Sequence, residues 1–131
     1  MHINTQDVLE KIESYRGTKT CSQAVLVAFC EVAGLPTENL DKIALGLTGG
    51  IGGTFDEGTC GALTGAIISL GFLCNNEEDI MTISEKLFYD FKGKYSTVNC
   101  GPLSNHGNDK LVCVDNCLFV AEAMCKYLNQ K

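Results

Sequence analysis

Apolar residues recur three and four positions apart along most of the chain, the spacing of helices that bury one face. This pattern predicts helices over residues 3–16, 38–47, 77–98 and 111–129. Two further segments, 21–33 and 60–74, are apolar on nearly all sides, which is typical of buried central helices. No alternating strand pattern, internal repeat or linker interrupts the series. We therefore expect residues 1–131 to form a single compact all-α domain of five or six helices.

The residues between the predicted helices are of the types that are favoured at the beginnings and ends of helices. Asn4, Thr20, Thr37 and Thr59 stand at N-cap positions, where a side-chain oxygen can accept a hydrogen bond from a free backbone N–H. Glycine, proline and asparagine follow the helices over residues 17, 34–36 and 75–76. The segment 100–102 should end the long fifth element, and residues 103–110 are expected to form a loop.

A glycine-rich loop precedes the second central helix. Glycines at positions 49, 50, 52, 53 and 58 allow positive φ angles and close approach of another backbone. With Thr59 as the cap, Cys60 would lie in the first helical turn, where free N–H groups and the helix dipole lower a thiol pKa. Cys60 is therefore expected to favour the thiolate, although a tight loop followed by a core helix with a buried cysteine is the simpler alternative.

Small residues also mark the start of this helix. Gly61 and Gly65 are four residues apart, so they lie on one face and allow a second helix to approach closely. The sequence leaves open whether that second helix belongs to the same chain or to the other chain of a homodimer.

Charge and composition narrow the classes of partner. The net charge of −6 and the pI near 4.8 disfavour binding to nucleic acid or to an anionic membrane. No apolar run approaches the length of a membrane span, and the first residues lack the pattern of a signal peptide, so a cytoplasmic location is expected. Eight cysteines in a reducing compartment indicate metal binding or redox chemistry more than structural disulfides.

Helix geometry sorts these cysteines into two groups. Cys21 and Cys30 would face opposite sides of one helix, and Cys60 and Cys74 would lie about 21 Å apart along another. Because of these separations, Cys30 and Cys74 are assigned to packing. Cys125 is assigned to packing as well, because the residues around it are apolar. The other five lie near helix ends, where chain segments can converge: Cys21, Cys60, Cys100, Cys113 and Cys117.

The chain resembles a known family in the segment from Cys21 to Leu26, in the glycine loop, in the run Cys-Gly-Ala-Leu-Thr-Gly over residues 60–65 and in two later cysteines. It is the family of redox-active proteins named for the pattern C, GCAxxG, C, C. The resemblance covers most of the chain and implies a small helical redox protein with four key cysteines, without an established substrate. The resemblance implies that Cys21, Cys60 and Cys100 are three of these key cysteines. Cys117 is favoured as the fourth because residues 117–123 look like the family's closing helix, with Cys113 as the substitute.

Four thiolates from different segments suit an iron–sulfur cluster, with backbone N–H groups of Gly52 and Gly53 directed at its sulfur atoms. Electron transfer through such a cluster, held by Cys21, Cys60, Cys100 and Cys117, is therefore the favoured function, although the chain has no C-x₂-C run. The alternative is cofactor-free thiol–disulfide exchange, with Cys60 as the nucleophile and Cys21, Cys100 or Cys117 as the resolving thiol.

Other interpretations rest on weaker signals. A zinc site would lack the paired knuckle spacing of structural zinc sites, and the glycine loop lacks the lysine of a phosphate-binding loop. A helical interaction module with purely structural cysteines is a third class. The expected partner is a redox protein or a small-molecule thiol, and no enzymatic reaction is specified by the sequence.

Overall fold

The computed structural model describes residues 2–130, and within that range the chain forms helices without any β-strand. The all-α prediction is thus confirmed. The described helices are α1 (Thr5–Tyr15), α2 (Cys21–Val32), α3 (Leu40–Leu45), α4 (Gly61–Leu73), α5 (Glu77–Tyr95), α6 (Cys100–Ser104) and α7 (Lys110–Asn129). None of these helices is long and apolar enough to cross a membrane.

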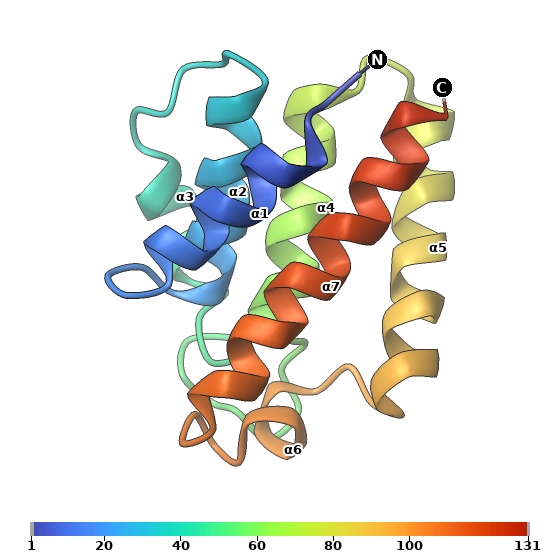
Figure 1. Ribbon diagram of the computed structural model, residues 1–131. Coiled ribbons are helices and arrows are strands. Elements are labelled where there is room, and N and C mark those ends of the chain that lie inside the picture. The colour runs from blue at the N-terminus through green and yellow to red at the C-terminus, as the bar shows by residue number, and fades with distance from the viewer. Residues whose placement is uncertain (1, 131) are drawn as a thin grey trace.

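The helices α2 and α4 form the centre, as their sequence predicted. They pack on each other, α1 and α7 cover them, α5 lies against α4 and α7, and α3 packs on α2 (Figure 1). Both central helices bury residues on most sides, and the largest side chains of the core include Phe29, Leu63 and Phe91. The beginnings of α2, α4 and α7, together with α6, gather at the lower end of the molecule in Figure 1.

The contact between α2 and α4 depends on glycine. A Cβ atom at Gly65 would lie 2.7 Å from the carbonyl oxygen of Ser22, and one at Gly61 would lie 2.9 Å from the carbonyl oxygen of Leu47. Both distances are shorter than real Cβ contacts, so any side chain would push the helices apart. The small-residue face of α4 is therefore used within one chain, because Gly61 and Gly65 are buried against α2 and the segment after α3.

The start of α4 differs from the prediction. Cys60 is the N-cap residue and Gly61 is the first residue of the helix, whereas Thr59 was expected to be the cap. The reason is a short antiparallel pairing: Thr59 forms a bridge with Asn99, flanked by hydrogen bonds from Cys60 N to Val98 O and from Cys100 N to Gly58 O, both 2.7 Å. This pairing holds Thr59 in extended backbone and brings Cys60 next to Cys100.

The same pairing explains a second difference. The helix α5 ends at Tyr95, three residues earlier than predicted, because the following residues run into the bridge. Cys100 then begins the short helix α6, whereas residues 100–102 were expected to end the preceding element and residues 103–110 to form a loop. Pro102 lies in the first turn of α6, where the lack of an N–H group does no harm.

Two of the remaining predicted caps are confirmed and one is wrong. Asn4 and Thr20 cap their helices as expected, and Thr20 forms a capping box with Gln23. Thr37 does not cap α3, which begins after Asn39 in the left-handed conformation with a φ of 66°.

The three cysteines assigned to packing lie in apolar surroundings. Cys30 and Cys125 are fully buried, and Cys74 is a half-buried residue packed against the main core. Cys30 belongs to a smaller cluster formed between α2 and α3.

Two glycine-to-alanine variants of α4 test the close packing. Gly65→Ala should destabilise the protein by about 1–3 kcal/mol, since the new methyl group would overlap the Ser22 backbone. Gly71→Ala is the matched control, because a Cβ atom at Gly71 would meet no other atom within 4 Å and alanine favours the helix by up to about 1 kcal/mol. Urea unfolding followed by circular dichroism gives both values. Equal free energies of unfolding for the two variants would contradict this account of the α2–α4 contact.

Candidate functional site

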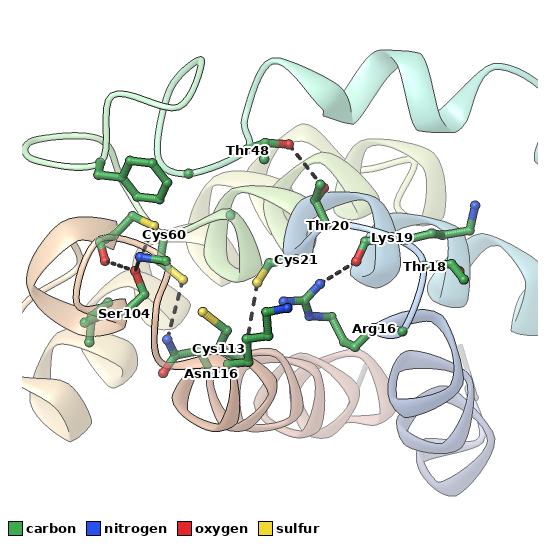
Figure 2. Close-up of a pocket in the computed structure, with 18 residues that line it drawn as sticks. Arg16, Thr18, Lys19, Thr20, Cys21, Thr48, Cys60, Ser104, Cys113 and Asn116 are labelled. Atoms are coloured by element: carbon green, nitrogen blue, oxygen red, sulfur yellow. Dashed lines mark hydrogen bonds between the residues drawn. The ribbon is translucent and has the colours of Figure 1, made fainter.

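A pocket of about 400 Å³ lies where the helices α2, α4, α6 and α7 begin. The first residues of these four helices line it, joined by the segment that connects α1 to α2 and by part of the glycine loop (Figure 2). The lining residues with chemically reactive or polar side chains are Arg16, Thr18, Lys19, Thr20, Cys21, Thr48, Cys60, Cys100, Ser104, Lys110, Cys113 and Asn116.

Four of the five cysteines predicted to act together line this pocket: Cys21, Cys60, Cys100 and Cys113. Cys117, favoured as the fourth member, is fully buried in the core beneath the lining. Cys113, its substitute, lies one helical turn closer to the start of α7 and reaches the pocket. Among the loop glycines, Gly49 lines the pocket, whereas Gly52 and Gly53 are exposed and lie outside the lining.

Cys21 and Cys113 form the closest pair. The Cys21 thiol donates a hydrogen bond to the Cys113 carbonyl oxygen at 3.9 Å, and the two thiols lie close enough for each to shift the pKa of the other. Figure 2 shows the two side chains facing each other from α2 and α7. Both residues are partly exposed, and the buried Cys117 lies close enough to Cys21 to raise its pKa. An accessible dithiol thus lies at the pocket wall.

The other two thiols are less accessible and have polar neighbours. Cys60 is only 3 % exposed, and its sulfur lies 3.8 Å from the side-chain nitrogen of Asn116. Cys100 is 8 % exposed, and its sulfur lies 3.6 Å from the hydroxyl oxygen of Ser104. Sequence reasoning missed both polar residues. The signal for Asn116 was a polar residue directly before Cys117 on the buried side of an apolar helix.

The expectation that Cys60 favours the thiolate is wrong. Burial, with a smaller contribution from the nearby Cys21, raises the pKa of the Cys60 thiol to about 12. The backbone N–H groups of Ala62 and Leu63 lower the pKa, as a helix start should, but their effect is smaller than that of burial. Cys60 therefore remains a protonated thiol at neutral pH.

The pKa values of the exposed pair also favour the neutral state. For Cys21 the hydrogen bond from Cys113 lowers the pKa, but the hydrogen bond with Cys117 and burial together raise it to about 12. For Cys113 the hydrogen bond to Cys21 and burial raise the pKa. The charge of Arg16 lowers both pKa values.

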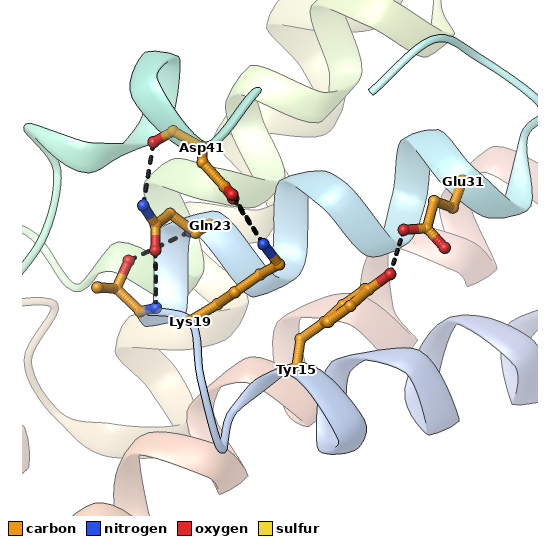
Figure 3. Close-up of polar contacts among 6 residues, drawn as sticks. Tyr15, Lys19, Gln23, Glu31 and Asp41 are labelled. Carbon is orange, nitrogen blue, oxygen red and sulfur yellow. Dashed lines mark hydrogen bonds and ion pairs between the residues drawn. The ribbon is translucent and has the colours of Figure 1, made fainter. Parts of the chain in front are cut away.

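The segment that forms one rim of the pocket is held in place from both sides. The Tyr15 hydroxyl donates a hydrogen bond to Glu31 of α2, and Lys19 forms an ion pair with Asp41 at 2.8 Å (Figure 3). The Gln23 amide adds a hydrogen bond to the Asp41 carbonyl oxygen at 3.1 Å. These contacts fix residues 16–20 between α1, α2 and α3.

Metal ligation has little geometric support. Within residues 2–130, no group of three or more histidine, cysteine, aspartate or glutamate side chains is placed so that it could hold a metal ion. His106 lies on the exposed surface, where its Nδ1 atom is 3.5 Å from a carboxylate oxygen of Asp56.

The raised pKa of Cys60 predicts a specific pH dependence of its alkylation. The thiolate is the reactive form, so the rate for Cys60 with iodoacetamide should rise about tenfold for each pH unit from 7 to 9.5 without a plateau. In the urea-unfolded chain the same thiol should level off near its ordinary pKa of 9.0, which serves as the control. Peptide mass spectrometry measures both rates. A plateau below pH 8 in the folded protein would mean that the helix start outweighs burial.

The difference between the pKa of Cys60 in the folded protein and in the unfolded chain contributes to the free energy of unfolding. The folded protein holds the Cys60 proton more tightly than the unfolded chain, so this contribution is present below pH 9 and is lost as the pH rises toward 12.

Comparison with known proteins adds one finding. Searches of curated proteins and of solved structures found no match. A family model described as "Putative redox-active protein (C_GCAxxG_C_C)" matches residues 19–130, a range that contains every cysteine of the pocket. The match begins just before the capping box of α2 and ends at the last turn of α7. The chain therefore belongs to the C_GCAxxG_C_C family of redox-active proteins.

Proposed function

We propose that the pocket thiols carry out the redox chemistry, with Cys21 and Cys113 as a reversible dithiol–disulfide pair. The observation that carries this proposal is the contact between these two partly exposed residues at the pocket wall, where the Cys21 thiol donates a hydrogen bond to the Cys113 carbonyl oxygen. No disulfide joins the cysteines of the described residues, so the structure corresponds to the reduced state of such a pair.

Cys21 is the better attacking thiol of the two. The interaction with Cys113 and the positive charge of Arg16 both act to lower the pKa of Cys21, which favours its thiolate. Cys21 is also the first residue of α2, where the helix dipole favours a negative charge. This assignment replaces Cys60 as the nucleophile, because Cys60 is almost completely buried and its neutral form is favoured.

The exchange proceeds in two balanced steps. The Cys21 thiol loses its proton to solvent, and its thiolate attacks one sulfur of a substrate disulfide; the substrate S–S bond breaks, a mixed disulfide forms and one substrate thiolate leaves. The Cys113 thiol then loses its proton, and its thiolate attacks the Cys21 sulfur, which closes the Cys21–Cys113 disulfide and releases the second substrate thiolate. The pair loses two electrons and two protons, which the substrate gains as two thiols.

The partner that fits this chemistry is a small-molecule thiol or disulfide, or a redox protein that presents one at the pocket. A reducing compartment such as the cytoplasm would keep the resting pair in the thiol form.

An iron–sulfur cluster is a second candidate, and one observation favours it. Four cysteines at the starts of four helices line one pocket, and Cys117 lies close enough to Cys21 to shift its pKa, which is more thiols than a dithiol site needs. The donor chemistry fits a cluster, but the arrangement does not, since no three of these side chains are placed to hold a metal. Cluster binding would require the cysteines to move closer together.

Cysteine-to-serine variants test the dithiol proposal. After mild oxidation with diamide, the protein should lose two hydrogens in mass and yield a peptide linked through Cys21 and Cys113. Cys21→Ser and Cys113→Ser should each abolish this linkage, while Cys74→Ser, which removes a partly exposed thiol outside the pocket, should leave it intact. Intact-mass and peptide-mapping mass spectrometry reads the result. A disulfide between Cys21 and a different cysteine in Cys113→Ser would show that another thiol resolves the mixed disulfide.

Anaerobic purification distinguishes the second candidate. Stoichiometric iron and acid-labile sulfide that disappear in both Cys60→Ser and Cys100→Ser would support a cluster and overturn the dithiol assignment, since these two thiols lie outside the proposed pair.

A further inference from the structure

The charges around the pocket differ in sign from those of the whole chain. The protein has ten lysine and arginine residues and sixteen aspartate and glutamate residues. Three of the basic residues, Arg16, Lys19 and Lys110, line the pocket, and no carboxylate is among the described residues that line it. A cationic pocket on an acidic protein attracts anionic small molecules and repels cationic ones.

The three basic residues are not equivalent. Lys19 forms an ion pair with Asp41, so its charge is already partly balanced. Arg16 donates a hydrogen bond to the Lys19 carbonyl oxygen, which is uncharged, and the Nε atom of Arg16 is buried without a hydrogen-bond partner. Lys110 is exposed at the start of α7; the neighbouring Asp109 accepts a hydrogen bond from Val112 N as the helix cap. Arg16 and Lys110 are therefore the cations best placed to meet a ligand.

Helix ends add to this positive potential. Cys21, Gly61 and Lys110 are the first residues of α2, α4 and α7, which are 12, 13 and 20 residues long, and all three line the pocket. The N-terminal end of each helix carries a partial positive charge. Figure 2 shows the Arg16 guanidinium turned toward Cys21, so the positive charge lies beside the dithiol pair.

We propose that the pocket selects small disulfides and thiols that carry an anionic group, with Arg16 and Lys110 holding the anion while the ligand sulfur faces Cys21. This substrate class rests on the proposed dithiol function, but the recognition of the anion does not. The pocket volume of about 400 Å³ lies within the range of about 300–1,000 Å³ for small-ligand sites.

The first experiment measures anion recognition without redox chemistry. Suberate is a dicarboxylate with the shape of 3,3′-dithiodipropionate in which two CH₂ groups replace the disulfide. It should shift the amide resonances of residues 16–21 and 110–113 in NMR titrations, whereas 1,8-octanediol and 1,8-diaminooctane should not. Equal shifts with all three compounds, or none with suberate, would overturn the anion site whatever the redox chemistry.

The second experiment measures selectivity in the reaction. The rate of Cys21–Cys113 oxidation should be greatest with 3,3′-dithiodipropionate, lower with bis(2-hydroxyethyl) disulfide and lowest with cystamine, which are anionic, neutral and cationic. Arg16→Gln should reduce the ratio of the anionic to the neutral rate about tenfold, as expected for loss of one charged hydrogen bond.

Two further variants complete the design. Lys110→Gln should lower the same ratio and is a surface change, so it remains informative if Arg16→Gln fails to fold. Lys126→Gln removes the same charge from the opposite end of α7 and should leave the ratio unchanged. Equal rates with the three disulfides would overturn the anionic substrate class alone. No oxidation of the pair by any of them, with suberate still bound, would overturn the dithiol function and keep the anion site.

Discussion

The close contact between α2 and α4 is the constraint on which the pocket depends. Gly61 and Gly65 allow the backbone of α4 to lie against Ser22, and this contact places the start of α4 beside the start of α2. Cys60 precedes one helix and Cys21 begins the other, so the same packing brings their sulfur atoms to one site. The glycines of the family motif therefore have a packing function, and through it they determine where the cysteines lie.

A second constraint is the short pairing around Thr59 and Asn99. It links the residue before α4 to the residue before α6, and so adds Cys100 to the site. Phe55 accepts a hydrogen bond from Gly101 N at 2.7 Å, and a Cβ atom at Gly101 would lie 2.9 Å from the Phe55 carbonyl oxygen. The glycine loop thus packs backbone against backbone on α6, and its main contribution in this structure is to shape the pocket wall.

Much of this arrangement could be predicted from the sequence. Helical periodicity indicated the central helices and most of their ends, and cap residues such as Thr20 were recognisable from their position. The separation of Cys30 and Cys125 from the other thiols followed from helix geometry and apolar surroundings. Cys21, Cys60 and Cys100 could be expected to meet at the site because each lies near a helix end, whereas Ser104 and Asn116 were missed.

The remaining features depend on contacts between distant segments. The cap of α4 shifted by one residue because Thr59 pairs with Asn99, which no local pattern could indicate. The choice between Cys113 and Cys117 depends on how far along α7 the pocket extends, since both share one helix face and lie one turn apart. The pKa of Cys60 was predicted in the wrong direction because a helix start contributes about 0.3–1 kcal/mol, less than one pKa unit at about 1.4 kcal/mol each, whereas burial acts more strongly.

The central claim is that Cys21 and Cys113 together store two electrons. A redox titration of the anaerobically purified protein in dithiothreitol buffers, with thiols counted by mass-tagging at each potential, tests it most directly. We predict one two-electron transition that converts these two cysteines and no others, and that is absent when either is serine. A protein whose thiols do not change across the titration, or whose electrons reside in bound iron and sulfide, would contradict it.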